Sequence, residues 1–259
     1  MHVHLPKPLH GWREFAGEVG IIVIGVLIAL TAEQVVERWG WNEQVSASRE
    51  ALRSDYTTIV VNARERIGED GCIRRRLNEL TAILSASHGT LPPLGDIGSP
   101  PERGWYPASW DGLVAAGIVT RMPRQEMLSY SNIAGAARGG EETSQQELYD
   151  WATIYSMVGP GRELQSGEAA QIRKALQSAM YRLNLLRLMA PQLEAMVFDT
   201  KILAPADVHE AKRQLEQLRH GANWQAICSP IPRPSGVILA APYDPAIQKN
   251  PMASIQLGR

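Results

Sequence analysis

The stretch Val19-Gly-Ile-Ile-Val-Ile-Gly-Val-Leu-Ile-Ala-Leu-Thr-Ala32 carries no charge and decides how the rest of the chain is organised. As an α-helix, its 14 residues cover about 21 Å, short of the roughly 30 Å hydrocarbon core of a bilayer. Extension to residues 12–38 closes this gap. Glu18 and Glu33 then lie near the two headgroup levels, where a charge costs less than at mid-bilayer. The sequence therefore predicts a transmembrane anchor over residues 12–38.

Side chains typical of membrane boundaries and of helix contacts accompany this span. The residues expected at the lipid–water interface are Trp12, Glu18, Trp39 and Trp41. An ion pair or proton relay facing a partner helix is the alternative for the glutamate. Two pairs of small residues spaced four apart would let a second helix approach closely. These pairs are Ala16 with Gly20 and Gly25 with Ala29. They predict contact with another membrane subunit or with a second copy of the chain.

The charges around the span predict its orientation. Lys7 and Arg13 precede its uncharged stretch and the long remainder of the chain follows, so the positive-inside tendency keeps residues 1–11 in the cytoplasm as a short tail. The rest of the chain would be exported to the periplasm, across a bacterial inner membrane. One alternative is a cleaved signal peptide, which the imperfect small-residue positions around Thr31 and Ala32 disfavour. The other is a buried helix of a soluble protein.

Beyond the span, apolar residues recur with helical spacing, and the sequence predicts an all-α fold in which an exported helical bundle covers residues 39–228. Gly40 and residues 68–71 are the expected bend and weak point of the first long helix. Further helices are expected at residues 109–116, 126–137, 147–158, 167–200 and 207–220, with Pro191 as a kink or end. Prolines and glycines predict a loop at residues 89–107 and an extended tail at residues 229–259.

The overall charge argues against a nucleic-acid partner. The 259 residues contain 26 Lys and Arg against 27 Asp and Glu, which leaves a formal charge of -1. Arg74, Arg75 and Arg76 form a basic run, but no aromatic residue is interleaved with it. The run is therefore predicted to be a solvated helix face.

The two cysteines, Cys72 and Cys228, lack the close spacing of zinc, haem or redox-active sites. In an oxidising compartment two lone cysteines tend to pair. We therefore expect a disulfide between the start of the helix at Ile73 and the segment after Trp224. Two separate buried thiols are the alternative.

Catalytic motifs are missing from the sequence, including HExxH, GxSxG, GxGxxG, the P-loop and the EF-hand loop. His209 and His220 would lie roughly 16 Å apart along one helix, too far to share a metal ion. The sequence accordingly predicts no catalytic residue, no metal ligand and no bound cofactor.

Two segments carry a resemblance to a known group. The first has Glu18, then Val23-Ile-Gly-Val-Leu-Ile-Ala-Leu30, then Trp41-Asn-Glu43; the second has Ser109-Trp-Asp-Gly-Leu113 followed by Ala116-Gly117 and Tyr130. This order resembles a group of bacterial single-pass membrane-anchored proteins of unknown function. The chain departs from the group at Ala32-Glu-Gln34, where polar Asn residues are usual. The resemblance implies a membrane anchor leading into a long helix, and it implies no chemistry.

These observations lead to one functional expectation and one alternative. The expectation is a non-catalytic scaffold or accessory subunit of a membrane protein complex, whose partners are the lipid bilayer and other subunits or a second copy of the chain. The alternative is a periplasmic sensor or small-ligand-binding bundle that signals through a partner, because only a short tail precedes the span. An enzyme ranks third.

Overall fold

The computed structural model describes residues 11–231, so the predicted tails at residues 1–11 and 229–259 lie almost entirely outside the described residues. Within this range the chain is all-α, as predicted, apart from two short strands. The helices are α1 (Trp12–Ala86), α2 (Ala108–Ala115), α3 (Arg124–Ile154), α4 (Ser166–Asp199), α5 (Pro205–Arg219) and α6 (Ala222–Cys228). Two 3₁₀ turns, η1 (Ile118–Arg121) and η2 (Tyr155–Met157), and the strands β1 (Thr90–Leu91) and β2 (Arg162–Glu163) complete the described elements.

Helix α1 continues for 75 residues, which corresponds to roughly 110 Å at 1.5 Å per residue. It stays helical through Gly40 and through residues 68–71, where the sequence predicted a bend and a weak point. A glycine inside a helix costs only about 1 kcal/mol relative to alanine, and tertiary packing can outweigh that. At Gly68 the reason is visible, because an added Cβ would lie 2.5 Å from Cη2 of Trp224. The missing side chain makes room for the indole ring.

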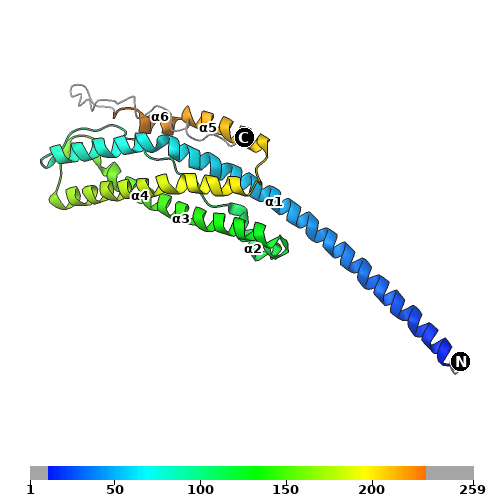
Figure 1. Ribbon diagram of the computed structural model, residues 1–259. Helices are drawn as coiled ribbons and strands as arrows, with labels where there is room; N and C mark the ends of the chain where they lie inside the picture. Colours follow the sequence, from blue (N-terminus) through cyan, green and yellow to red (C-terminus); the bar gives the residue numbers. More distant parts are fainter. Residues whose placement is uncertain (1–10, 232–259) are drawn as a thin grey trace, which may run out of the picture.

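The N-terminal part of α1 extends away from the bundle (Figure 1). It is long and apolar enough to cross a membrane, and its most apolar window has no residue buried within the chain. Large side chains such as Ile21, Ile22 and Ile28 are more than half exposed. The buried-helix alternative predicts the opposite, whereas a cleaved signal peptide would show the same exposure.

The second half of α1 packs with α3 and α4 to form the bundle, and α5 and α6 lie along the other side of α1 (Figure 1). Helix α3 runs away from the exposed part of α1, and α4 returns towards it. Helix α3 is one helix where the sequence predicted two, at residues 126–137 and 147–158, so that prediction is wrong. The Gly139-Gly140 pair does not end it, because Gly140 packs beneath the Trp105 ring, whose Cε3 would be 3.1 Å from an added Cβ. Pro191 also lies inside α4 without ending it.

The predicted loop at residues 89–107 connects α1 to α2 and is packed rather than free. Its start pairs antiparallel with β2, with Thr90 opposite Glu163 and Leu91 opposite Arg162. Further along, four side chains enter the core. These are Leu91, Leu94, Ile97 and Trp105, each at most 4% exposed.

The buried apolar residues form two separate clusters. The first surrounds Leu52, Tyr56 and Ile59 of α1, on the side nearer the exposed helix. The second surrounds Ile73, Leu77 and Leu80 at the far end. The stretch of α1 between Ala63 and Cys72 therefore crosses the bundle where neither cluster fills the interior.

Candidate functional site

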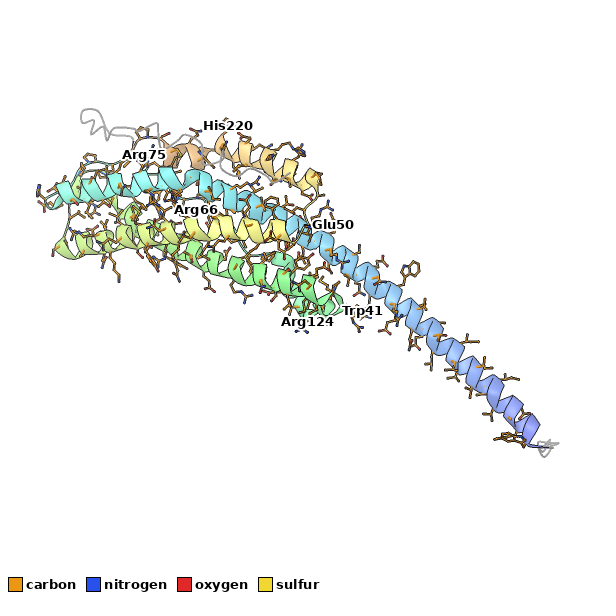
Figure 2. All side chains as sticks on the ribbon, in the orientation of Figure 1. Trp41, Glu50, Arg66, Arg75, Arg124 and His220 are labelled. Carbon is orange, nitrogen blue, oxygen red and sulfur yellow. A yellow bond between two sulfur atoms is a disulfide. The ribbon has the colours of Figure 1, made fainter. Side chains whose placement is uncertain are left out.

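A layer of buried charges begins within the first apolar cluster and extends towards the second, and α1 supplies most of it. Arg64 donates a hydrogen bond from Nε to Oε1 of Glu194 on α4 at 2.7 Å. Arg66, near the middle of the bundle in Figure 2, donates from Nη2 to Oε1 of Glu147 on α3 at 2.6 Å. The four side chains are at most 7% exposed. Two neighbouring arginines of α1 thus fasten it to two different helices.

The same turn of α1 also holds the loop that leads to α2. Glu65 accepts two hydrogen bonds from Arg103, at 2.8 Å from Nε and 3.1 Å from Nη2. One turn earlier, Asn62 donates from Nδ2 to the carbonyl oxygen of Gly104 at 2.6 Å. A bidentate arginine–carboxylate pair fixes orientation as well as distance, so this loop has a defined position against α1.

Glu69 lies one turn beyond Glu65 and has no exposed surface. Within the described residues neither of its carboxyl oxygens has a hydrogen-bond partner. Burial raises the pKa of Glu69 to about 8, and the neighbouring Glu65 carboxylate adds to the rise while Arg66 and Arg103 oppose it. Glu69 therefore holds a proton at neutral pH.

The layer is electrically balanced only when one carboxyl group is protonated. Its members are three arginines and four glutamates: Arg64, Arg66, Arg103, Glu65, Glu69, Glu147 and Glu194. Three of the glutamates pair with the arginines, so a proton on Glu69 leaves no net charge. Burial also raises the pKa of Glu147, against the opposing effect of Arg66. A buried unpaired charge is far more costly than a buried neutral acid, which explains why the proton stays on Glu69.

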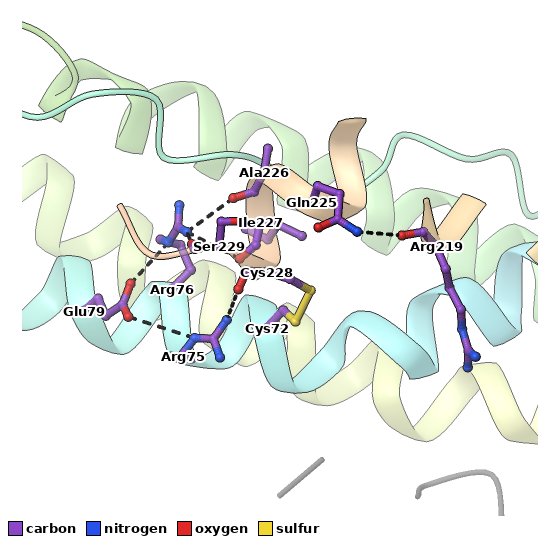
Figure 3. Close-up of a disulfide and its surroundings, with 10 residues drawn as sticks. All are labelled: Cys72, Arg75, Arg76, Glu79, Arg219, Gln225, Ala226, Ile227, Cys228 and Ser229. Carbon is purple, nitrogen blue, oxygen red and sulfur yellow. Dashed lines mark hydrogen bonds and ion pairs between the residues drawn. A yellow bond between two sulfur atoms is a disulfide. The ribbon is translucent and has the colours of Figure 1, made fainter. Parts of the chain in front are cut away.

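A second constellation, which we call the C-terminal clamp, joins α1 to α6 (Figure 3). The sulfur atoms of Cys72 and Cys228 lie at bonding distance, 2.06 Å apart, across 156 residues of sequence. Arg75 donates to the carbonyl oxygen of Cys228. Together with Gly68 beneath Trp224, these residues recur every three or four positions along one face of α1. The partner of Cys72 is therefore the last residue of a short helix that the sequence did not predict.

Arg76 is the centre of the C-terminal clamp. Its side chain is 1% exposed, so the prediction that residues 74–76 form a solvated face is wrong for this arginine. It donates to the carbonyl oxygens of Ile97, Ala226 and Ser229. The last carbonyl groups of a helix have no partner within it, and a guanidinium group can satisfy several of them at once. Arg76 thus caps α6 and holds the loop at Ile97 in one contact.

The loop residue Gly98 could not carry a side chain. Its φ of +63° lies in the left-handed region, and an added Cβ would be 2.8 Å from the backbone C of Ala226. Its N–H donates to Oδ1 of Asp96 at 2.9 Å, which forms the turn. The loop backbone therefore lies directly against α6.

The residues predicted within the membrane span fall on different faces of α1. Nine residues separate Ala16 from Gly25 and also Gly20 from Ala29, which is two and a half turns of helix. The two small-residue pairs therefore lie on opposite faces and cannot form one contact stripe. Apart from adjacent residues and the nearby backbone of α1, no atom of the described chain lies within 4 Å of a Cβ added at Gly20 or Gly25.

The predicted interfacial residues also divide. Trp12 and Trp39 are 79% and 77% exposed, and Glu18 is exposed as well. Trp41 instead faces the bundle, where its ring lies 4.6 Å from Cζ of Arg121 in η1. Its Nε1 donates to Oε1 of Glu37 at 3.1 Å.

The charged layer has a structural role, because its ion pairs hold the helices together. Its arginines and three of its glutamates are committed to one another, and the described residues contain no cluster of three or more His, Cys, Asp or Glu suited to a metal ion. The one glutamate of the layer without a partner among the described residues is Glu69, whose buried carboxyl can gain or lose a proton. No known protein family, curated protein or solved structure matches the chain.

Sequence reasoning missed the charged layer, although a signal for it exists. The apolar stripe of α1 passes through Ile59 and Ala63 and resumes at Ile73 and Leu77. At three- and four-residue spacing, the positions that follow Ala63 on this stripe are Arg66 and Ile67, and the structure buries the arginine and leaves the isoleucine half-buried. A charged residue where a helix stripe demands an apolar one indicates a buried ion pair or a functional group.

Proposed function

We propose that the protein is a single-pass inner-membrane protein with a periplasmic helical bundle, acting as a non-catalytic scaffold or accessory subunit of a membrane protein complex. One observation carries this proposal. Helix α1 is a single helix whose apolar N-terminal window is unburied and whose second half is fastened into the bundle by buried ion pairs. Such a helix holds the bundle at a set position relative to the bilayer, which is what a scaffold requires.

The proposed partner contact is in the span. Gly25 and Ala29 lie at the centre of residues 12–38 and expose backbone on one face, which favours close helix packing in lipid. Ala16 and Gly20, on the opposite face, lie nearer the cytoplasmic boundary. We therefore assign the subunit or self contact to the Gly25 face.

Blue-native electrophoresis of detergent-extracted membranes tests this assignment. We expect the full chain to migrate in a species well above its 28.5 kDa monomer mass. The double variant Gly25→Leu with Ala29→Leu should shift it to the monomer, and the matched variant Ala16→Leu with Gly20→Leu should leave the complex intact. Monomer migration of the unaltered chain, or loss of the complex only in the matched variant, would contradict the proposal.

The proposed topology places the N-terminus in the cytoplasm and the bundle in the periplasm. The Cys72–Cys228 bond supports export, because disulfides persist in oxidising compartments. Carbonate washing of membranes should leave the chain in the pellet. External protease applied to spheroplasts should remove the bundle. Release of the chain by carbonate, or protection of the bundle in intact spheroplasts, would rule out this topology.

A second candidate function is sensing, and Glu69 favours it. This glutamate is buried without a hydrogen-bond partner among the described residues, and it lies on the same helix as the proposed span. Loss of its proton would leave an unpaired charge inside the bundle, near the carboxylates of Glu65 and Glu147. Sensing would have to be passed to a partner through α1. It predicts that the contacts of the span change between pH 6 and pH 9 and that Glu69→Gln abolishes this change.

A further inference from the structure

The end of the bundle nearest the apolar part of α1 is formed by α2, η1 and the start of α3. Figure 2 places Trp41 and Arg124 at this end. Val114 of α2 is 47% exposed and Leu128 of α3 is 41% exposed, and Arg121 and Arg124 between them are exposed as well. Apolar and basic side chains are thus exposed together at this end of the bundle.

The height of this surface relative to the span follows from the contact between Arg121 and Trp41. The guanidinium carbon lies 4.6 Å from the centroid of the indole ring. Trp41 is three residues beyond the end of the span at residue 38, or about 4.5 Å along the helix. As a helix, residues 12–38 cover about 40 Å, which corresponds to the hydrocarbon core together with both headgroup regions. Turn η1 therefore stands at the outer edge of the headgroup region.

We propose that this end of the bundle is a second membrane contact that docks onto the anionic phospholipid headgroups around α1. The docking surface consists of Val114, Ala115, Arg121, Arg124 and Leu128. The inference rests on the proposed membrane anchor and deepens it. The bundle then rests on the bilayer, and α1 does not hold it away from the membrane as a free stalk.

The charges near the docking surface favour phosphate as its ligand. The carboxylates close to it have other partners: Glu126 pairs with Arg49 at 2.7 Å and Asp111 with Arg138 at 3.4 Å. Glu37 accepts a hydrogen bond from Nε1 of Trp41 at 3.1 Å. Basic residues immediately outside a span are attracted to anionic lipid, and small apolar side chains beside them can enter the headgroup boundary. Continuity with the span identifies the occupant, because the proposed span, which lipid would surround, ends three residues before Trp41.

Photocrosslinking of the full chain in nanodiscs that contain phosphatidylglycerol tests the docking surface. A benzophenone amino acid is placed at Val114, at Val23 inside the span, or at Tyr149, an exposed position farther along α3. We expect lipid adducts from Val23 and Val114 and several-fold fewer from Tyr149. Arg121→Glu combined with Arg124→Glu should lower the adduct yield at Val114 several-fold, and Arg173→Glu, at an exposed site on α4, should not.

The outcomes separate the docking surface from the anchor. Adducts from Val23 without adducts from Val114 would overturn the docking surface and leave the anchor standing. Absence of adducts from Val23 would overturn the anchor itself. Crosslinks from Val114 to protein instead of lipid, or a yield unaffected by the two charge reversals, would also overturn the proposal.

Discussion

Arg66 of α1 and Glu147 of α3 form an ion pair that is sealed inside the bundle, with side chains 5% and 1% exposed and Nη2 2.6 Å from Oε1. Nε of the same arginine has no hydrogen-bond partner among the described residues. The pair therefore joins two helices at a buried site, where a charge without a partner would not be solvated by water. Removal of one member should therefore cost more stability than removal of both, because the remaining charge would be buried without a partner.

The first prediction concerns the removal of one or both members of this pair. Arg66→Met should lower the free energy of unfolding by about 3–5 kcal/mol, because Glu147 is left charged and buried. Arg66→Met with Glu147→Leu should recover most of this loss. Thermal unfolding of the full chain in mild detergent, followed by circular dichroism, measures both. Additive losses in the double variant would contradict the coupling.

The second prediction concerns pH and Glu69. The pKa of this group is raised to about 8 in the folded chain from an ordinary value of 4.5. The folded state therefore holds a proton that the unfolded state has lost, so stability falls as pH rises from about 4.5 to about 8 and then levels. Glu69→Gln imitates the protonated acid and removes this dependence.

This prediction is tested by measuring the free energy of unfolding of both chains at pH 5 and at pH 8.5. Glu69→Gln should match the unaltered chain at pH 5 and exceed it at pH 8.5 by an amount on the order of several kcal/mol, since each pKa unit corresponds to about 1.4 kcal/mol. Glu142→Gln, at an exposed site of α3, serves as the control and should leave the pH profile unchanged. A profile that Glu69→Gln does not alter would show that this carboxyl is not the group that titrates.

The third prediction concerns the disulfide. By the chain-entropy model, a closure across 156 residues stabilises the folded state by up to about 5 kcal/mol. Cys72→Ser with Cys228→Ser should lower the unfolding temperature, and dithiothreitol should lower that of the unaltered chain equally. Reductant should have no effect on the double variant. The disulfide would be contradicted if dithiothreitol left the unfolding temperature of the unaltered chain unchanged and labelling found two free thiols in it.

The fourth prediction concerns the cap on α6. Arg76→Met removes the donor that serves the carbonyl oxygens of Ala226 and Ser229, and hydrogen bonds to a charged group contribute about 1.5–3 kcal/mol. We expect the amides of residues 222–228 to exchange with deuterium much faster while those of α3 keep their rates. Arg74→Met, one residue from Arg75 on the same helix, is the control and should leave α6 protected.

Much of the fold could be read from local pattern. The stripe of α4, with Ile172, Leu176, Ala179 and Leu183, predicted a long core helix, and the structure buries all four residues in α4. Cys72 and Cys228 were expected to pair and lie at bonding distance. Helix stripes and lone cysteines carry such information because each depends mainly on the residue type and its spacing.

The errors came where a distant contact decides the outcome. The sequence predicted two helices, at residues 126–137 and 147–158, but Trp105 packs against Gly140 and α3 continues between them. The run of three arginines was predicted to be exposed to solvent, but Arg76 is buried where it donates to the carbonyl groups at the end of α6. In both cases the neighbour is far away in the sequence, so local propensity could not reveal it.

By itself, the amino-acid sequence determined that the chain is helical and that its first long apolar segment can cross a membrane, since both follow from periodicity and hydropathy along a single helix. Only the tertiary structure decided which charges are buried, where Trp41 meets Arg121, and why Glu69 keeps its proton. Burial and pairing depend on groups brought together by packing, and the free energy of a charge changes by several kcal/mol with those surroundings.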